Sequence, residues 1–231
     1  MHTTRQITTL LTLVGILTTA PVMAEGEREL AKNFSYILGL QTGNHIRKQL
    51  HSAIDDINLE SMQLGINDAM HGRKPKFDIA EITFWSGHFM KMLEERSKAK
   101  GEQNLANGKQ FLTDYAKREG VETASSGLAF RELRAGKGRQ PGIGQTVRIH
   151  YRGLRIDGAE FSRSDDNGGT GVEVVLRKTL GGWQEALTLM SPGAKWEVVI
   201  PPALAYGAKG QGNIEPNETL VFELELLEIT Q

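Results

Sequence analysis

The sequence contains no cysteine in its 231 residues. Disulfide bonds, a thiolate nucleophile, cysteine-ligated zinc and a lipidated cysteine anchor are therefore excluded, and any catalysis must use other groups. A surplus of one charge is also missing, because 27 Lys and Arg residues balance 28 Asp and Glu residues and leave a net charge of −1. Such a chain has no strong field to attract a polyanion, so we expect no nucleic-acid partner.

The apolar stretch near the N-terminus, residues 10–17, is well short of the roughly 20 residues that a membrane-spanning helix needs. Arg5 precedes this stretch and small residues follow it at 22–24, which is the pattern of a signal peptide. We therefore expect residues 1–24 to be a signal peptide, and a retained anchor is the weaker alternative. A secreted protein without cysteine suits the bacterial periplasm, so we expect that location, with or without association with the outer membrane.

Residues 25–120 show apolar side chains at the three- and four-residue spacing that is typical of amphipathic helices. Asn58 is a candidate N-cap of a second helix. Asp78 and Glu81 form the pattern of a capping box, which predicts the start of a third helix.

The third helix is expected to be long. Its pattern extends over residues 78–118, which corresponds to about 60 Å of helix. Residues 94–104 are polar on every side, so we interpret this part as a solvated stalk. Gly101 and Gly108 each weaken a helix by roughly 1 kcal/mol relative to alanine, which favours bending there.

These helices cannot enclose much core in a single copy, so we expect the helical part to form a homodimer. Methionine is flexible and fills irregular interfaces, and the helical part contains several of these residues: Met62, Met70, Met90 and Met92. An ordinary monomeric three-helix core that uses methionine as a filler is the alternative.

After Gly120 the apolar spacing changes from helical to alternating, which indicates strands with one buried face. Asp157-Gly158 predicts a hairpin turn, and residues 183–190 predict one short helix. In the last predicted strand, residues 219–229, the apolar positions change parity near Leu227, which indicates a bulge. The expected fold class is α+β: an all-helical N-terminal dimerisation module (25–120) with a long connecting helix, then an antiparallel sheet wrapped on one short helix (121–231).

Several patterns that carry chemistry in other proteins fail in this chain. The glycine clusters at residues 136–138 and 168–171 lack the spacing of a phosphate-binding loop and a following helix, so we interpret them as turns. No histidine lies in a zinc-protease motif and no serine in a GxSxG motif, so we expect neither a metal, a cofactor nor a hydrolase triad. The arginines of the second half are expected to pair with glutamates across neighbouring strands.

What remains is a set of aromatic residues on a small sheet: Tyr151, Phe161, Trp183, Tyr206 and Phe222. By composition alone they would be core residues. Their sequence context changes that interpretation. It resembles the catalytic domain of FKBP-type peptidyl-prolyl cis/trans isomerases in four segments: VRIHYRGLRIDGAEF at 147–161, 180–187, 205–208 and 217–222.

The N-terminal half is similar to the dimerisation region of the periplasmic, macrophage infectivity potentiator-like subgroup of this family. The similarity rests on residues 35–39 and 117–121. Together the resemblances imply a peptidyl-prolyl isomerase that assists the folding of secreted proteins. They also imply unfolded or proline-containing polypeptides as partners, a homodimer, and a macrolide as a pocket ligand.

The resemblance also implies roles for individual residues. Trp183 is expected to be the floor of the pocket, with walls formed by Tyr151, Phe161 and Phe222. Tyr206 is expected to donate a hydrogen bond to a substrate carbonyl. The backbone N–H of Leu180 is a second donor, and Ile214 closes one side.

Three positions depart from the family pattern. Ser162 stands where the family usually has aspartate, Val172 replaces an aromatic wall, and Thr179 replaces an aliphatic residue. A serine offers no carboxylate at the rim, so we expect a weaker isomerase than is typical. A dimeric holdase chaperone with little isomerase activity is the alternative function, and a surface-exposed host-interaction protein is a third.

Overall fold

The structure is a computed structural model that describes residues 25–164 and 169–230. The expected signal peptide, residues 1–24, lies outside the described residues. The chain divides into two compact units, of which the first ends at Gln49 and the second begins at Leu50. Over the described ranges, no helix combines the length and the apolar character that crossing a membrane requires.

The first unit is described by one helix, α1 (Glu25–Leu50), which reaches one residue into the second unit. Acidic residues in its first turn and basic residues in its last turn complement the helix dipole. None of its residues is buried, although it carries large apolar side chains such as Leu30 and Phe34. An amphipathic helix with an uncovered apolar face needs another surface to pack against.

The second unit begins with a 3-10 turn, η1 (His51–Asp56), followed by α2 (Leu59–Met70). The predicted caps are confirmed. The Asn58 side chain accepts a hydrogen bond from the Ser61 N–H at 2.8 Å. Asp78 accepts from the Glu81 N–H at 2.8 Å and the Glu81 carboxylate accepts from the Asp78 N–H at 3.0 Å, which completes the capping box.

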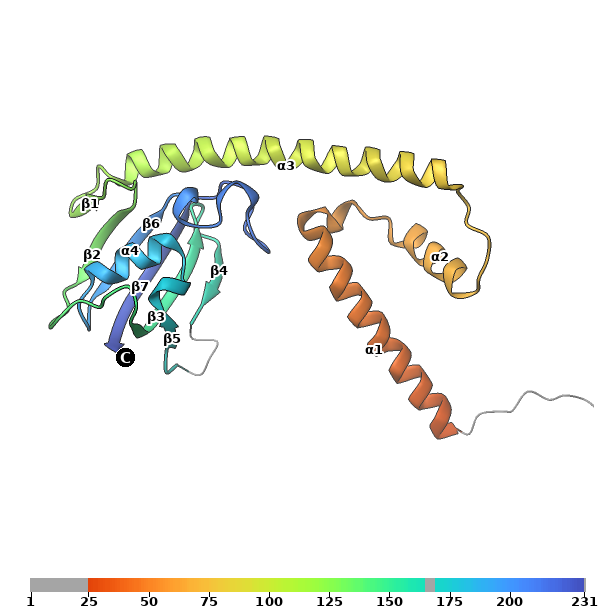
Figure 1. Ribbon diagram of the computed structural model, residues 1–231, viewed down its shortest axis with the longest axis horizontal. Coiled ribbons are helices and arrows are strands. Elements are labelled where there is room, and N and C mark those ends of the chain that lie inside the picture. The colour runs from red at the N-terminus through yellow and green to blue at the C-terminus, as the bar shows by residue number, and fades with distance from the viewer. Residues whose placement is uncertain (1–24, 165–168, 231) are drawn as a thin grey trace, which may run out of the picture. The chain divides into compact units, whose positions relative to one another are not determined.

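Helix α3 (Ile79–Tyr115) has 37 residues, which at 1.5 Å per residue is about 55 Å (Figure 1). The prediction of one long helix is confirmed. The interpretation of residues 94–104 as a solvated stalk is wrong at Gly101, which is buried. Farther along the helix, Gly108 and Tyr115 are also buried. The glycines lie where the helix meets the rest of the unit, so they allow close approach.

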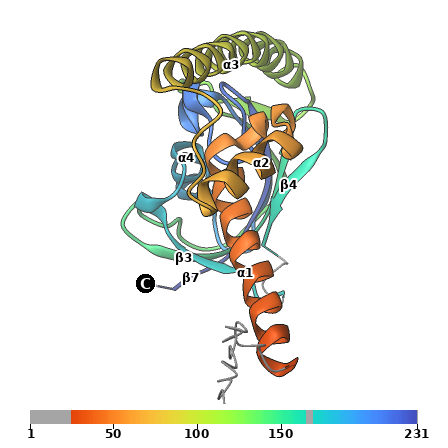
Figure 2. The same ribbon diagram turned by 90° about the vertical axis from the view of Figure 1, so that its right-hand side faces the viewer.

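All strand pairs in the sheet are antiparallel, in the order β1-β2-β6-β7-β3-β4, and β5 pairs with β3. The predicted short helix is α4 (Gly181–Leu189), and the expected α+β class is confirmed. Figure 2 shows the same elements after a quarter turn, with α3 outside the sheet. The strands are β1 (Val121–Thr123), β2 (Ala129–Arg134), β3 (Thr146–Arg155), β4 (Glu160–Arg163), β5 (Val172–Val175), β6 (Lys195–Ile200) and β7 (Leu220–Ile229).

Alternating residues of the central strands pack on opposite faces of the sheet. On one face, Phe222 and Leu224 of β7 join a core that includes Trp183 and Leu187 of α4. On the other face, Val221 belongs to a second cluster with buried Tyr115, Ala129 and Val199, onto which Phe111 and Leu112 pack. The C-terminal part of α3 therefore covers the sheet face opposite α4, which the sequence analysis did not anticipate.

The predicted turn, bulge and charge pairs are confirmed. Gly158 has φ 88° in the β3–β4 hairpin, a left-handed conformation that glycine adopts without strain. The register of β7 against β3 shifts so that Leu227 is the extra residue. The sheet arginines pair with glutamates, as Arg148 does with Glu173 at 2.7 Å. The boundary expected at residue 120 stays a prediction.

Candidate active site

The buried centre of the candidate site consists of two rings from different elements. Trp183 lies in the first turn of α4 and Phe222 in β7, with ring centroids 5.3 Å apart and planes at 87°. Both are buried, at 8% and 2% exposed. Gly182 lets α4 approach the sheet, because a Cβ there would lie 2.4 Å from Cγ2 of Ile200. The close approach seats the indole against the sheet.

Two further rings contact this centre, one on either side. Tyr151 of β3 lies 4.9 Å from Trp183 at 61°, and Phe161 of β4 lies 5.6 Å from Phe222 at 84°. Edge-to-face contacts of this kind are favoured by the ring quadrupoles. Tyr151 and Phe161 are only partly buried. The four rings therefore form a chain of contacts with a buried centre and partly exposed ends.

A β-bulge lets two consecutive residues of β4 face this site. Gly153 of β3 is paired with Ser162, and the next residue, Leu154, is paired with Glu160, so Phe161 is the extra residue. In a regular strand, neighbouring side chains point to opposite faces. Here the Phe161 ring reaches Phe222, while the Ser162 hydroxyl lies 3.0 Å from the Tyr151 hydroxyl.

Gly153 is a site residue that the sequence analysis missed. It lies on the same face of β3 as Tyr151, between Phe161 and Phe222. A Cβ at Gly153 would be 2.8 Å from Cζ of Phe161 and 2.9 Å from Cε1 of Phe222. The two rings occupy the space of a side chain at this position. A glycine inside an alternating strand is the sequence signal that could have found it.

Tyr206 and Ile214 come from the loop between β6 and β7 and pack against the same core cluster. Ile214 is 5% exposed and Tyr206 is partly buried. Burial raises the pKa of Tyr206 above its ordinary value, and the neighbouring Tyr151 raises it further. The phenol therefore stays protonated near neutral pH and can donate a hydrogen bond.

Leu180 is the N-cap residue of α4 and packs at the edge of the same cluster. Within the described part of the chain, no group accepts a hydrogen bond from its backbone N–H. Trp183 Nε1 is likewise buried with no partner among the described residues. Two N–H donors near the rings are thus left without an acceptor among the residues that the structure describes.

The two remaining predicted site residues are Val172 and Thr179. Val172, at the start of β5, packs against the core cluster. The Thr179 hydroxyl donates to the carbonyl of Leu176 at 2.7 Å, and the Thr179 carbonyl accepts from Gln184 Nε2 at 2.8 Å. The Thr179 hydroxyl is therefore engaged with the local backbone.

The arrangement can bind an apolar ring and offer hydrogen bonds to a carbonyl. Among the described residues, the hydroxyls of Tyr151 and Ser162 contact each other, and no histidine or carboxylate is hydrogen-bonded to either of them to activate a nucleophile. Over residues 25–164 and 169–230, no group of His, Asp and Glu side chains is suited to hold a metal ion.

Comparison with known proteins gives two family matches. Residues 137–227 match the FKBP-type peptidyl-prolyl cis-trans isomerase model, and residues 31–131 match the domain amino terminal to FKBP-type peptidyl-prolyl isomerase. The FKBP-type 22 kDa peptidyl-prolyl cis-trans isomerase of Escherichia coli (strain K12) is 39% identical over 200 residues, which cover 84% of this chain and 93% of that protein.

Two further relatives match both halves. The peptidyl-prolyl cis-trans isomerase Mip of Coxiella burnetii is 35% identical over 225 residues, 94% of each chain. The crystal structure of FkpA from Escherichia coli has a TM-score of 0.61 at 32% identity and covers 86% of this chain and 95% of that one. The resemblance inferred from the sequence is confirmed: the chain belongs to the family of FKBP-type peptidyl-prolyl cis-trans isomerases.

Proposed function

We propose that the five aromatic residues form the pocket in which this isomerase binds a prolyl ring and rotates the preceding peptide bond: Tyr151, Phe161, Trp183, Tyr206 and Phe222. The observation that carries the proposal is the chain of edge contacts from Tyr151 through Trp183 and Phe222 to Phe161. Its centre is buried and its ends are partly exposed. A proline side chain is apolar and compact, so these rings match it in polarity.

Rotation about the Xaa-Pro bond is opposed by amide resonance, with a barrier of about 18–20 kcal/mol. The planar amide is more charge-separated than the twisted one, so water stabilises the planar form more. A pocket of rings removes that water and binds the twisted amide better than the planar one. A reduction of the barrier by about 7 kcal/mol would accelerate the rotation by about five powers of ten.

The hydrogen-bond donors at the edge of the rings orient the substrate in this proposal. The Tyr206 hydroxyl and the Leu180 N–H each donate to a substrate carbonyl, and Ile214 closes one side. The support is the raised pKa of Tyr206, which keeps its proton in place, and the free Leu180 N–H within the described residues. Within the described ranges, the Trp183 N–H has no acceptor that would compete with a substrate.

We further propose that the rate is lower than is typical of the family. Ser162 offers a neutral hydroxyl to Tyr151 at 3.0 Å where the family usually has a carboxylate, and Val172 provides a smaller wall than an aromatic ring. The Ser162→Asp variant should therefore raise kcat/KM. An equal or lower value in the folded variant would contradict this proposal.

The experiment that tests the site is catalysed cis/trans exchange of a short Xaa-Pro peptide. Tyr206→Phe removes one hydrogen bond worth about 1–1.5 kcal/mol, so kcat/KM should fall about tenfold. Tyr36→Phe, at an exposed position in α1, is the matched control and should behave as the parent. A macrolide should compete with the peptide for the parent protein. An unchanged kcat/KM in Tyr206→Phe would show that the pocket is assigned wrongly.

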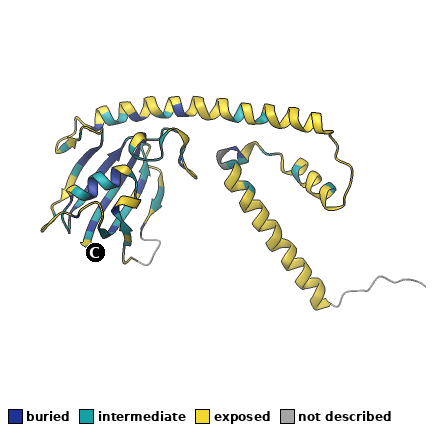
Figure 3. Cartoon of the chain, in the orientation of Figure 1, coloured by how far each residue is buried: buried dark blue, intermediate teal, exposed yellow. Residues whose placement is uncertain are grey.

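We propose that the helical part forms a homodimer. Figure 3 shows exposed residues along α1, α2 and the first part of α3. The exposed side chains include large apolar ones, and a monomeric soluble protein rarely leaves so many uncovered: Leu30, Phe34, Leu59, Leu64, Met70, Ile82, Phe84 and Trp85. Light scattering of residues 25–231 should give twice the chain mass, and a single-chain mass would contradict this.

We propose that the protein acts in the periplasm on unfolded or proline-containing polypeptides. The signal-peptide pattern of residues 1–24 supports export. Cell fractionation should recover a shortened chain outside the cytoplasm. The alternative of a holdase with little isomerase activity has no better support, because both relatives compared by sequence carry the name of isomerase.

A further inference from the structure

The loop between β6 and β7 carries two residues of the proposed pocket, Tyr206 and Ile214. Between residues 201 and 219 it contains two short 3-10 turns, η4 (Pro202–Leu204) and η5 (Gly207–Lys209), and one isolated bridge. Long loops with so little regular structure are uncommon in compact domains and are usually functional. The contacts that hold this loop therefore determine the positions of Tyr206 and Ile214.

Helix α3 makes direct hydrogen bonds to the last part of this loop. Asn104 Nδ2 donates to the carbonyl of Pro216 at 3.0 Å and to Oε2 of Glu215 at 3.1 Å. In the opposite direction, Asn217 Nδ2 donates to the carbonyl of Gly101 at 3.2 Å. These bonds are partly buried, so water competes with them less than on an open surface.

Two glycines allow the helix to come close enough for these bonds. A Cβ at Gly108 would lie 2.1 Å from Oγ1 of Thr219, and a Cβ at Gly101 would lie 3.0 Å from Cβ of Pro216. Asn104 lies between them at three- and four-residue spacing, so all three residues share one face of α3. We call Gly101, Asn104 and Gly108 the docking face.

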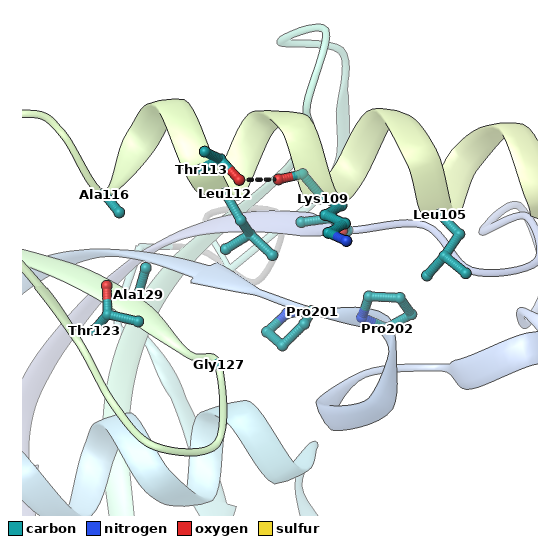
Figure 4. A pocket seen from close by; sticks show the side chains of 11 residues that line it. Leu105, Lys109, Leu112, Thr113, Ala116, Thr123, Gly127, Ala129, Pro201 and Pro202 are labelled. Carbon is teal, nitrogen blue, oxygen red and sulfur yellow. Dashed lines mark hydrogen bonds between the residues drawn. The ribbon is translucent and has the colours of Figure 1, made fainter.

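Figure 4 shows the neighbouring part of this contact, where Leu105 and Leu112 of α3 lie above Pro201 and Pro202 at the start of the same loop. A groove of about 420 Å³ remains between them. The helix thus fits closely at the end of the loop and loosely at its beginning. The close contact is the part that can fix the loop.

The contact continues from the docking face to the pocket through the backbone. The Asn217 N–H donates to the carbonyl of Gly207 at 2.9 Å, and Gly207 directly follows Tyr206. Asn217 has φ 55°, a left-handed conformation that asparagine tolerates better than most residues. On the other side, Glu215 directly follows Ile214, which exchanges two backbone hydrogen bonds of 2.9 Å with Gln211.

We propose that the docking face of α3 is a clamp that positions Tyr206 and Ile214, and that Asn104 is a positioning residue of the isomerase. The proposal rests on the proposed pocket. When the clamp is weakened, only a fraction f of the molecules has the loop in the binding conformation. The apparent dissociation constant of the substrate then rises by the factor 1/f. Substrate binding restores the ordered loop, so KM rises while kcat is unchanged.

The test compares Asn104→Ala with Asn107→Ala, the same change at an exposed position of the same helix. In the full mature chain, the backbone amides of residues 207–219 should exchange hydrogen about tenfold faster in Asn104→Ala. This factor corresponds to the loss of about 1.4 kcal/mol of hydrogen bonding to the loop. KM for an Xaa-Pro peptide should rise several-fold at constant kcat. Exchange in β6 and β7 should stay at the parent level, and Asn107→Ala should match the parent throughout.

The proposal is overturned if Asn104→Ala and Asn107→Ala give the same KM and the same exchange, or if Asn104→Ala lowers kcat and leaves KM unchanged. If Asn104→Ala does not fold, Asn217→Gly is used in its place. Glycine accepts φ 55° and keeps the backbone hydrogen bond to the Gly207 carbonyl, while the side-chain hydrogen bond to the Gly101 carbonyl is removed. The same outcomes decide. Failure of the pocket assignment is separate, because it would show as an unchanged kcat/KM in Tyr206→Phe.

Discussion

Replacing Gly153 by alanine should distort the pocket without changing any polar group. The added Cβ would lie 2.8 Å from Phe161 and 2.9 Å from Phe222, and ordinary contacts begin near 3.4 Å, so both rings must move by about half an ångström. Overpacking of this kind costs about 1–3 kcal/mol. Alanine also lowers the entropy of the unfolded chain, which offsets about 0.4–1 kcal/mol. The net loss in unfolding free energy should be about 1–2 kcal/mol.

The assay combines urea unfolding with catalysed exchange of an Xaa-Pro peptide under conditions where the variant is fully folded. Because the displaced rings are the proposed walls, kcat/KM should fall at least about tenfold. Gly144→Ala is the matched control, since a Cβ there meets nothing within 4 Å and its backbone is not left-handed. If folded Gly153→Ala retains the parent's kcat/KM, Phe161 and Phe222 do not form walls of the pocket.

Three further predictions follow from buried hydroxyl groups. Burial and Tyr151 raise the pKa of Tyr206, so this hydrogen-bond donor keeps its proton. The value of kcat should therefore be constant between about pH 6 and pH 9, and a decrease of kcat within this range would contradict the role of Tyr206 as a donor. Burial, followed by the hydrogen bond to Glu197 at 2.9 Å, raises the pKa of Tyr115. Folding therefore favours neutral Tyr115, so its contribution to the free energy of unfolding is complete below the unfolded-state pKa of about 10 and is lost as the pH rises above that value. Tyr115→Phe should lower the free energy of unfolding by about 1–2 kcal/mol at pH 7 and make its decrease at alkaline pH shallower. Thr219→Val replaces a buried hydroxyl that has no hydrogen-bond partner among the described residues. Urea unfolding of this variant should therefore give an equal or higher free energy of unfolding, and a loss above about 1 kcal/mol would show that the hydroxyl does have a partner.

Local signals in the sequence were sufficient for much of the fold. The capping box at Asp78 depends on two side chains three residues apart, so it can be recognised without tertiary structure. The bulge at Leu227 was predicted because a change of parity in a strand with one buried face must be absorbed somewhere. The aromatic residues were recognised as a site only through resemblance, since composition alone favoured a core.

Features that depend on contacts distant in sequence were not predicted. The bulge at Phe161 leaves no parity signal, because β4 is only four residues long. Gly101 and Gly108 were interpreted as weak points of a helix, since glycine has a low helix propensity. Their actual environment is set by Pro216 and Thr219, more than a hundred residues away in the sequence, and no periodicity in α3 encodes that partner.

The account depends most on the claim that the rings around Trp183 receive the prolyl residue. The chain has three tryptophans, so the indole N–H region of a nitrogen–proton correlation spectrum has three signals. Trp196 is an internal control, because its Nε1 donates to Glu132 at 3.3 Å. Titration with an Xaa-Pro peptide should shift the Trp183 signal progressively and leave that of Trp196 in place, while the peptide's cis and trans signals exchange. Accelerated exchange with an unmoved Trp183 signal would contradict the account.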